Sequence, residues 1–261
     1  MRIVVCVKYV PDLQSTRGFA DGRVVRKPED GSMNELDEHA VEAALQLVEA
    51  AGGEVIALCV GGPDAITAVR RAFQLGVTTG VLVADDAIAG SDVFCTARVL
   101  AAAVRVLAED GPIDLVLTGM AALDGLTSMM PTVLAAELGW AQLTLASSLV
   151  VDAGVARIER HVADAHEVVE ANLPVLVSIT DEANKPRFPN FKAIVAARSA
   201  EVTRLSLAEL GVDPATVGAA GSRTIVLDAS PRPPRAEREI LHDTGDAGER
   251  LAAFLVGKGF V

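Results

Sequence analysis

The sequence predicts a doubly wound α/β fold, in which helices cover both faces of a mostly parallel β-sheet. Short apolar runs rich in β-branched residues alternate with helical patterns about every thirty residues in the first half of the chain, which implies right-handed βαβ crossovers. Of the 261 residues, 51% are hydrophobic but only 3% are aromatic, a mixture suited to helices packed on buried parallel strands. We therefore expect a Rossmann-like sheet, with antiparallel hairpins and a C-terminal arm added to it.

The first strand is expected at residues 2–7, an apolar β-branched run that ends before Pro11. We place this strand at the centre of the sheet. Residues 12–34 are rich in Gly, Asp, Arg and Pro and show no hydrophobic period, so they form either a functional excursion or a poorly ordered surface loop. Apolar residues at helical spacing then predict a helix over residues 37–51.

The alternation of strands and helices continues along the chain. Further strands are expected at residues 55–60, 81–84 and 113–117, and helices at residues 64–75 and 91–108. In such a sheet, ligands bind at the carboxyl ends of the strands where the strand order reverses. If the chain winds outward from a central first strand and then crosses back, the first and fourth strands flank that reversal. The loops after Val7 and Leu117 would then face one cavity.

The loop after the fourth strand is a candidate anion site. The strand breaks off at Thr118-Gly119, and the following helix has Thr127 or Ser128 as its cap and Pro131 in its first turn. A helix N-terminus presents unpaired backbone N–H groups and the positive end of a dipole, which suits a phosphate or another anion. Every α/β protein has several such junctions, so a plain connecting loop is the alternative.

Beyond Trp140 the apolar residues recur with period two, which predicts antiparallel hairpins. Another buried strand is expected at residues 173–180. Two prolines, two aromatic residues and three cations then gather in residues 181–192. Phe188 and Phe191 in this loop either anchor a partner protein or pin the loop to its own core.

Residues 222–261 are predicted to form an arm outside the α/β domain of residues 1–221. The arm contains a proline-rich run at residues 231–235 and a short helix at residues 248–256. Such a segment is more often a clasp on a neighbouring subunit, or a disordered tail, than a separate domain.

Composition and charge exclude several classes of function. A net charge of -12 argues against nucleic acid and anionic membranes as partners. The chain shows neither an apolar run of about 18 residues nor a signal-peptide pattern, so we expect a soluble, cytoplasmic protein. Cys6, Cys59 and Cys95 are widely spaced in apolar surroundings and are expected in the core. No phosphate-binding glycine motif and no catalytic triad can be assembled, so we expect a protein without catalytic residues.

Short motifs follow one another along the chain. They are Val-Lys-x-Val-Pro at 7–11, Met-Asn-x-x-Asp-Glu-x-Ala-Val-Glu at 33–42, Ala-x-x-x-Gly at 72–76, Asp-Gly at 124–125 followed by Pro131, Glu-Arg at 159–160 leading through Glu167 to Leu-Pro at 173–174, and Asn-x-Pro-Arg-Phe-Pro-x-Phe-Lys at 184–192. In their order and spacing they resemble the β subunit of electron transfer flavoproteins over nearly the whole chain.

This resemblance implies an adenine nucleotide alpha hydrolase-like variant of the fold and a heterodimer with an α subunit that holds most of an FAD. Such a heterodimer accepts electrons from dehydrogenases, such as the acyl-CoA dehydrogenases of fatty acid oxidation. It passes them to the respiratory chain through a membrane quinone oxidoreductase. The β subunit itself would bind AMP, or a second FAD, as a buried ligand.

The resemblance also implies which residues serve as sites. The nucleotide positions would be Cys6, Asn34, Val60, Gly119, Met120, Ala121, Ala122, Leu123, Asp124, Gly125, Leu126, Thr127, Ser128, Met129 and Met130. The partner-recognition loop would span residues 181–198, with Arg187, Phe188, Phe191 and Lys192 at the contact. These nucleotide positions agree with a cavity between the first and fourth strands.

Two functions are therefore weighed. An electron-carrier subunit is favoured by the lack of a catalytic constellation and by an arm and a loop suited to partners. The alternative is a stand-alone adenine-nucleotide-binding α/β enzyme or sensor, which would need a self-sufficient site.

Overall fold

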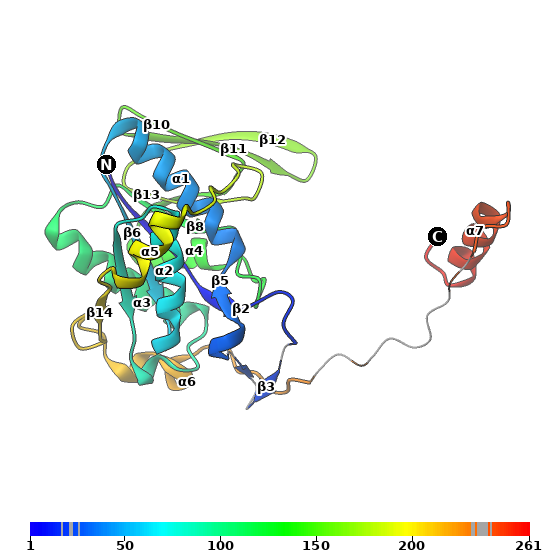
Figure 1. The fold of residues 1–261 in the computed structure, drawn as a ribbon, viewed down its shortest axis with the longest axis horizontal. Coiled ribbons are helices and arrows are strands. Elements are labelled where there is room, and N and C mark those ends of the chain that lie inside the picture. Colours follow the sequence, from blue (N-terminus) through cyan, green and yellow to red (C-terminus); the bar gives the residue numbers. More distant parts are fainter. Residues whose placement is uncertain (17, 21–22, 26, 231–232, 234–239, 241) are drawn as a thin grey trace. The chain divides into compact units, whose positions relative to one another are not determined.

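The computed structural model describes residues 1–16, 18–20, 23–25, 27–230, 233, 240 and 242–261 (Figure 1). The chain divides into two compact units, Met1–Ala229 and Ser230–Val261. Each unit is described by itself.

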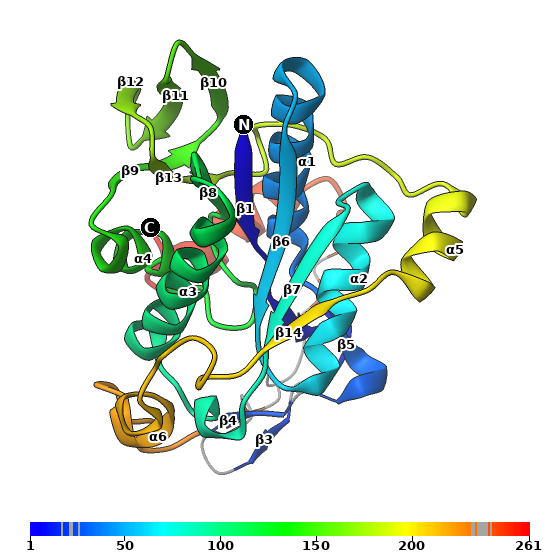
Figure 2. The same ribbon diagram turned by 90° about the vertical axis from the view of Figure 1, so that its left-hand side faces the viewer.

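A seven-stranded parallel sheet forms the centre of the first unit (Figure 2). Its strand order is β14-β7-β6-β1-β8-β13-β9, and every neighbouring pair is parallel. The strands are β1 (Arg2–Cys6), β6 (Glu54–Val60), β7 (Thr79–Val83), β8 (Leu115–Gly119), β9 (Ala141–Ala146), β13 (Val175–Ile179) and β14 (Thr203–Leu205). The predicted α/β fold and the central position of the first strand are both confirmed.

Helices cover both faces of this sheet. They are α1 (Glu35–Ala51), α2 (Ile66–Leu75), α3 (Val93–Leu107) and α4 (Met130–Leu138). Helix α5 (Phe191–Ser199) packs on α2 instead, and the short α6 (Gly218–Gly221) follows β14 in the chain. Because side chains alternate along a strand, Ile3 and Val5 pack with α1 and α2 in one buried cluster, while Val4 and Cys6 pack with α3 and α4 in another. The sheet therefore separates two hydrophobic cores.

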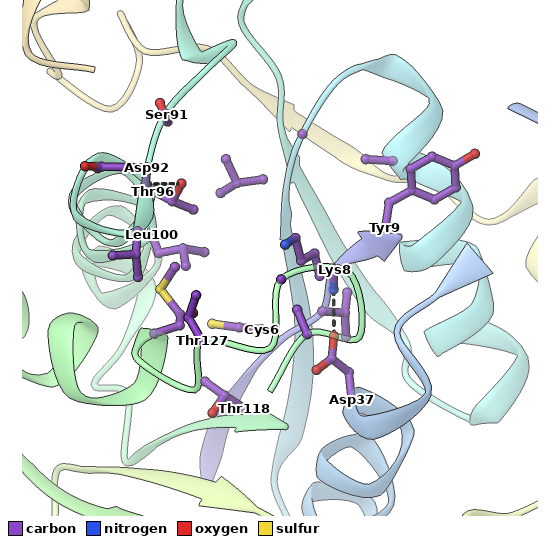
Figure 3. A pocket seen from close by; sticks show the side chains of 18 of the residues that line it. Cys6, Lys8, Tyr9, Asp37, Ser91, Asp92, Thr96, Leu100, Thr118 and Thr127 are labelled. Atoms are coloured by element: carbon purple, nitrogen blue, oxygen red, sulfur yellow. Dashed lines mark hydrogen bonds between the residues drawn. The ribbon is translucent and has the colours of Figure 1, made fainter. Parts of the chain in front are cut away.

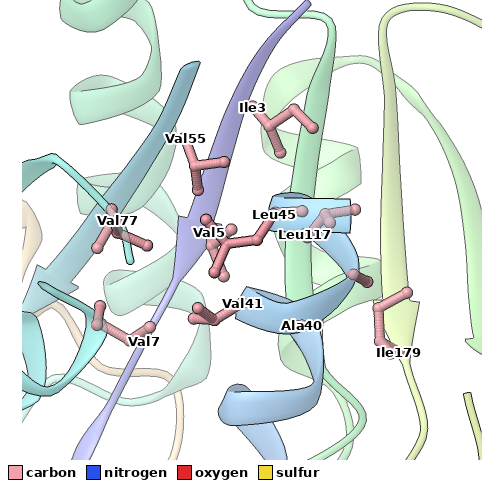
Figure 4. Close-up of a cluster of buried hydrophobic side chains, with 14 of the residues drawn as sticks. Ile3, Val5, Val7, Ala40, Val41, Leu45, Val55, Val77, Leu117 and Ile179 are labelled. Atoms are coloured by element: carbon pink, nitrogen blue, oxygen red, sulfur yellow. The ribbon is translucent and has the colours of Figure 1, made fainter. Parts of the chain in front are cut away.

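Helix α1 shows why these elements form where they do. Val41 and Leu45 lie on its buried face against Ile3 and Val5 of the central strand (Figure 4). Burial of a side chain of this size contributes about 1.5–3 kcal/mol. The helix ends at Gly52, whose N–H donates to the carbonyl of Val48 at 2.8 Å and whose positive φ of 77° turns the chain out of the helix.

The strand order places the ends of β1 and β8 beside each other. The chain adds β6 and then β7 on one side of β1, and it next returns to add β8 on the other side. The reversal therefore lies between β1 and β8, as predicted. Parallel strands end at the same edge of the sheet, so the loops that follow these strands meet there.

The predicted hairpins form a separate three-stranded antiparallel sheet. It consists of β10 (Ser148–Asp152), β11 (Val155–Val162) and β12 (Ala165–Asn172). The turn between β10 and β11 has positive φ at both Ala153 and Gly154, at 47° and 79°, which is typical of a two-residue hairpin turn.

The prediction was wrong for the first part of this region, because β9 belongs to the parallel sheet and pairs with β13. Leu143 and Ala146 are buried there, whereas Ala141 and Gln142 are exposed. An edge strand alternates as a hairpin strand does, and a shift in its pairing with β13 moves burial to Ala146 in place of Leu145.

Residues 12–34 contain short pieces of structure. Strand β2 (Tyr9–Pro11) pairs with β5 (Gly31–Met33), and β3 (Phe19–Ala20) pairs with β4 (Arg23–Val24). A 3-10 turn, η1, spans Pro28–Asp30. The β2–β5 pair therefore ties both ends of this excursion together.

The predicted recognition loop is only partly a loop, because helix α5 begins at Phe191. Asn190 caps this helix by accepting a hydrogen bond from the N–H of Ala193 at 2.8 Å. Ala197 is the one buried residue of α5. Such a helix has no apolar stripe, so periodicity could not reveal it.

The second unit contains helix α7 (Ala247–Gly257), close to the predicted helix at 248–256. Leu251 and Val256 are exposed within this unit. The predicted proline-rich run at 231–235 lies outside the described residues, apart from Pro233. Among the residues that the structure describes, no helix combines the length and the apolar character needed to span a bilayer.

Candidate functional site

A cavity of about 520 Å³ opens at the carboxyl ends of the adjacent strands β7, β6, β1 and β8 (Figure 3). Its walls come from the loops that follow these strands, namely residues 6–9, 60–62, 85–93 and 119–128. The prediction that the loops after Val7 and Leu117 face one cavity is confirmed. The loops at 61–62 and 85–93 were missed, because each resembles an ordinary connection in the sequence.

Most of the residues expected at a nucleotide line this cavity. They are Cys6, Val60, Gly119, Met120, Ala121, Ala122, Gly125, Leu126, Thr127, Ser128 and Met130. The cavity lining does not include Asn34, Leu123, Asp124 and Met129. Contacts of Asn34 and Asp124 show that they hold the surrounding loops instead.

Asn34 is fully buried and joins the start of α1 to the loop after β8. Its Nδ2 donates to Oδ1 of Asp37 at 2.8 Å and to the carbonyl of Ala121 at 2.9 Å. Its Oδ1 accepts from the N–H of Leu123 at 3.0 Å. Asn34 therefore sets the path of the loop without lining the cavity.

Asp37 lines the cavity and was missed as a site residue, although the spacing Asn34-x-x-Asp37 places both residues in one helical turn. Its Oδ2 accepts from the N–H of Lys8 at 2.8 Å, which Figure 3 marks with the dashed line between these two residues. Burial raises the pKa of the Asp37 carboxyl from 3.8 to about 7, against hydrogen bonds from Asn34 and Lys8 that act to lower it.

The end of β8 packs closely on this carboxyl. A Cβ atom at Gly119 would lie 2.6 Å from Oδ1 of Asp37 and 2.8 Å from the backbone of Leu36. Only glycine therefore allows the start of α1 to approach the strand so closely.

An ion pair joins the loops on the two sides of the strand reversal. Nζ of Lys8 lies 2.8 Å from Oδ1 of Asp124, and the Asp124 side chain is only 3% exposed. Lys8 also lines the cavity. The buried Asp124 therefore orients a cation at the cavity edge.

The helix after the loop starts later than predicted. Helix α4 begins at Met130 with Met129 at its cap position, and no side chain caps it, so the expectation for Thr127 or Ser128 was wrong. Leu126 and Ser128 have positive φ values of 50° and 51°, which a helix cannot include. Thr127 and Ser128 line the cavity instead, and the first turn of α4 opens towards it.

The loop at 85–93 brings three aspartates to the cavity, and the carboxylates of Asp85 and Asp92 accept hydrogen bonds from backbone N–H groups. Asp92 caps α3 by accepting from the N–H groups of Phe94 and Cys95, both at 3.0 Å. It also accepts from the N–H groups of Arg223 and Thr224. Burial acts to raise the pKa of Asp92, but these hydrogen bonds outweigh it and lower the pKa.

A buried hydroxyl in the cavity lining lacks a partner. Within the described part of the chain, Oγ1 of Thr118 makes no hydrogen bond, and Thr118 is nearly fully buried. A buried polar group without a partner costs about 1–3 kcal/mol. A polar group on a bound molecule would satisfy this hydroxyl.

These features suit binding better than thiol chemistry. Burial raises the pKa of the Cys6 thiol, so the thiol stays protonated at neutral pH. Val60, Ile88 and Leu100 provide an apolar wall for a flat ring, and Lys8 and the first turn of α4 provide donors for an anion.

The predicted partner residues lie on a different surface. Phe188 is 95% exposed and Phe191 is 82% exposed, so these rings do not pin the loop to its own core. Lys192 is also exposed. Arg187, in contrast, is engaged within the chain, with ion pairs to Glu42 at 2.8 Å and Glu49 at 2.6 Å.

Comparisons with known proteins identify relatives over the full length. A family model described as "Electron transfer flavoprotein domain" matches residues 21–210. The chain is 37% identical to the electron transfer flavoprotein subunit beta of Mycobacterium leprae, with 99% of each chain covered. It is 32% identical to the protein of the same name from Clostridium acetobutylicum, covering 99% of this chain and 97% of that one. It is 30% identical to the caffeyl-CoA reductase-Etf complex subunit CarD of Acetobacterium woodii, again covering 99% and 97%.

Proposed function

The chain belongs to the family of electron transfer flavoprotein β subunits, and we propose that it works in the cytoplasm as a carrier subunit paired with an FAD-bearing α subunit. The pair accepts electrons from acyl-CoA or related dehydrogenases and passes them to the respiratory chain through a membrane quinone oxidoreductase. The observation that carries this proposal is the match along the whole chain, which includes the loops around the cavity as well as the fold.

The cavity is proposed to hold an adenine nucleotide, either AMP or the adenosine end of a second FAD. Its volume of about 520 Å³ lies within the range of about 300–1,000 Å³ typical of ligand pockets. Cys6 and Val60 would contact the ring, and Oγ1 of Thr118 offers an unpaired polar atom. The phosphate would lie on the backbone N–H groups at the start of α4, near Lys8. AMP supplies no redox chemistry there; the FAD of the complex does.

Co-expression with the α subunit of the same organism tests the carrier function. We expect a yellow heterodimer that an acyl-CoA dehydrogenase reduces in the presence of its acyl-CoA substrate. Purification of a colourless single chain that binds no second subunit would contradict the proposal.

Filling the cavity should remove the nucleotide. A Cβ atom at Gly125 would meet nothing within 4 Å, so a side chain there can enter the cavity without backbone strain. Gly125→Phe should lower the nucleotide content by at least about tenfold, a loss of about 1.4 kcal/mol or more in binding free energy. Mass spectrometry of ligand released from the denatured heterodimer measures this content. Gly125→Ala is the matched control and should keep the nucleotide; equal content in the two variants would show that the nucleotide binds elsewhere.

Removal of the second unit should weaken the heterodimer. Helix α7 exposes Leu251 and Val256, apolar side chains that a partner surface would cover. Deletion of residues 230–261 should raise the Kd for the α subunit by at least about tenfold, as measured by calorimetry. Leu251→Asp should reproduce much of this loss, whereas Glu249→Gln on the same helix should not. Equal affinity with and without residues 230–261 would contradict an arm that clasps the α subunit.

A further inference from the structure

The segment that carries Phe188 and Phe191 is held in place by polar contacts. It comprises residues 184–200, which follow β13 and include α5. Its two aromatic rings and Val195 are exposed, and Ala197 is the one buried residue of α5. Ala197 and α5 contact the core and α2, but the part of the segment before α5, which carries Phe188, is held mainly by polar contacts.

The strongest of these contacts is an arginine held by two glutamates of α1. Nε of Arg187 lies 2.8 Å from Oε2 of Glu42, and its Nη2 lies 3.2 Å from Oε1 of Glu42. Nη1 and Nη2 also donate to the carboxylate of Glu49 at 2.6 Å and 3.0 Å. The planar guanidinium thus bridges two carboxylates about two turns apart on the same helix.

Glu42 extends this contact to the backbone. Its Oε2 also accepts from the N–H of Arg187 at 3.1 Å, and its Oε1 accepts from Nε2 of Gln46 at 2.8 Å. Glu42 is buried, and burial acts to raise its pKa, but the hydrogen bonds from Arg187 outweigh this effect and lower it. Both the side chain and the main chain at position 187 are therefore attached to α1.

Two further contacts hold the segment on either side of Arg187. Nδ2 of Asn184 donates to the carbonyl of His39 at 2.9 Å, and Nδ1 of His39 lies 3.1 Å from the carbonyl of Asn184. At the other end, Nη1 of Arg70 donates to the carbonyls of Ala197 and Arg198 at 2.6 Å and 2.7 Å. Arg70 thus binds the last turn of α5, where carbonyl groups lack intrahelical partners.

We propose that Arg187, held by Glu42 and Glu49, is a positioning residue that fixes the surface formed by Phe188, Phe191 and Val195 before a partner arrives. A surface ordered in advance avoids the loss of loop entropy on binding, which otherwise opposes association. Arg187 therefore acts through the neighbouring rings and does not itself bind the partner. This inference rests on the proposed carrier function, and it places the docking of the dehydrogenase at this surface because Phe188 and Phe191 are exposed there.

The first test measures order in the heterodimer without a dehydrogenase. Arg187→Gln should speed amide hydrogen exchange in residues 188–200 by about tenfold. Arg187→Lys should lose protection as well, because a lysine ammonium cannot bridge the two carboxylates in the geometry of the guanidinium. Arg71→Gln is the matched control, because Arg71 forms a 2.7 Å ion pair with Glu38 of α1 and is 30% exposed, against 33% for Arg187.

The control should leave exchange in residues 188–200 unchanged. Should Arg187→Gln impair folding, Glu49→Gln serves as the milder variant, because Glu49 is exposed. Unchanged exchange in both Arg187→Gln and Glu49→Gln would overturn the inference.

The second test is a double-mutant cycle with Phe191→Ala, read out as the KM and kcat of an acyl-CoA dehydrogenase of the same organism with the heterodimer as electron acceptor. In the otherwise wild-type heterodimer, Arg187→Gln should raise KM about tenfold and leave kcat nearly unchanged. In the Phe191→Ala background, the same substitution should raise KM by much less. Equal effects of Arg187→Gln in both backgrounds would overturn the positioning role. If Phe191→Ala itself leaves KM unchanged, the proposed docking site fails, whatever the exchange data show about Arg187.

Discussion

Between pH 5 and pH 8, the chain should lose about 2 to 3 kcal/mol of folding stability relative to its Asp37→Asn variant. The reason is the position of Asp37, which lies buried between the start of α1 and the end of β8. Burial raises the pKa of its carboxyl from 3.8 to about 7, so ionisation in the folded state is unfavourable.

The sign follows from proton binding in the two states. Between pH 4 and pH 7 the folded chain holds a proton on Asp37 that the unfolded chain has released, so stability falls as the pH rises. The stability that this proton on Asp37 contributes is fully present below pH 3.8 and is lost as the pH rises through about 7. Each pKa unit corresponds to about 1.4 kcal/mol, which sets the size of the effect over this window.

Urea unfolding of the wild type and of Asp37→Asn at several pH values measures the difference. Groups that titrate in both proteins cancel in this difference. Asp92→Asn is the control, because the pKa of Asp92 is lowered below 3.8, so its contribution stays constant from pH 5 to pH 8 and is lost only as the pH falls below 3.8. Parallel stability curves for the wild type and Asp37→Asn from pH 5 to pH 8 would show that Asp37 stays ionised throughout.

Replacing Phe191 with alanine should weaken binding to the dehydrogenase by about 2 kcal/mol, roughly thirtyfold in affinity. Central aromatic anchors contribute most at protein interfaces, whereas charges at the rim contribute less and act mainly on the association rate. The ring is 82% exposed on a capped helix. Its removal should therefore leave the FAD content and the melting temperature of the heterodimer nearly unchanged.

Steady-state reduction of the heterodimer by the dehydrogenase, measured beside a thermal melt, separates docking from stability. Val150→Ala is the matched control, because Val150 is an exposed apolar residue on β10, outside residues 184–200. A loss of several degrees in the melt of Phe191→Ala would mean that the ring supports the fold. An equal loss of electron transfer in Val150→Ala would mean that the docking surface extends beyond this segment.

Much of the fold could be predicted because it depends on local patterns. The apolar run that forms β1 and the helical spacing of Val41 and Leu45 report burial directly, since a strand and a helix repeat with different periods. Hydrophobic periodicity did not predict the correct element where a segment buries only one face or only one residue. Strand β9 showed a period of two because it lies at the sheet edge, and α5 buries only Ala197.

Some cavity residues could likewise be predicted from local patterns, whereas others could not. The loop at 119–130 could be predicted because it follows a buried strand and precedes a helix. Asp37 and Lys8 were missed, because a lone carboxylate or ammonium in a sequence looks the same whether it faces water or a buried partner. Leu126 and Ser128 have positive φ values, so α4 begins later than predicted. Leucine and serine do not indicate this backbone conformation in a sequence.

By itself, the sequence determined the α/β class, the central first strand, the cavity at the strand reversal and the resemblance to the family, because each follows from local patterns and from their order along the chain. Only the tertiary structure decided which charges pair. Arg187 meets Glu42 across 145 positions, and Lys8 meets Asp124 across 116. An ion pair depends on distance in space, which a local pattern does not record. The structure therefore showed Arg187 paired with Glu42 of α1 while Phe188 and Phe191 are exposed.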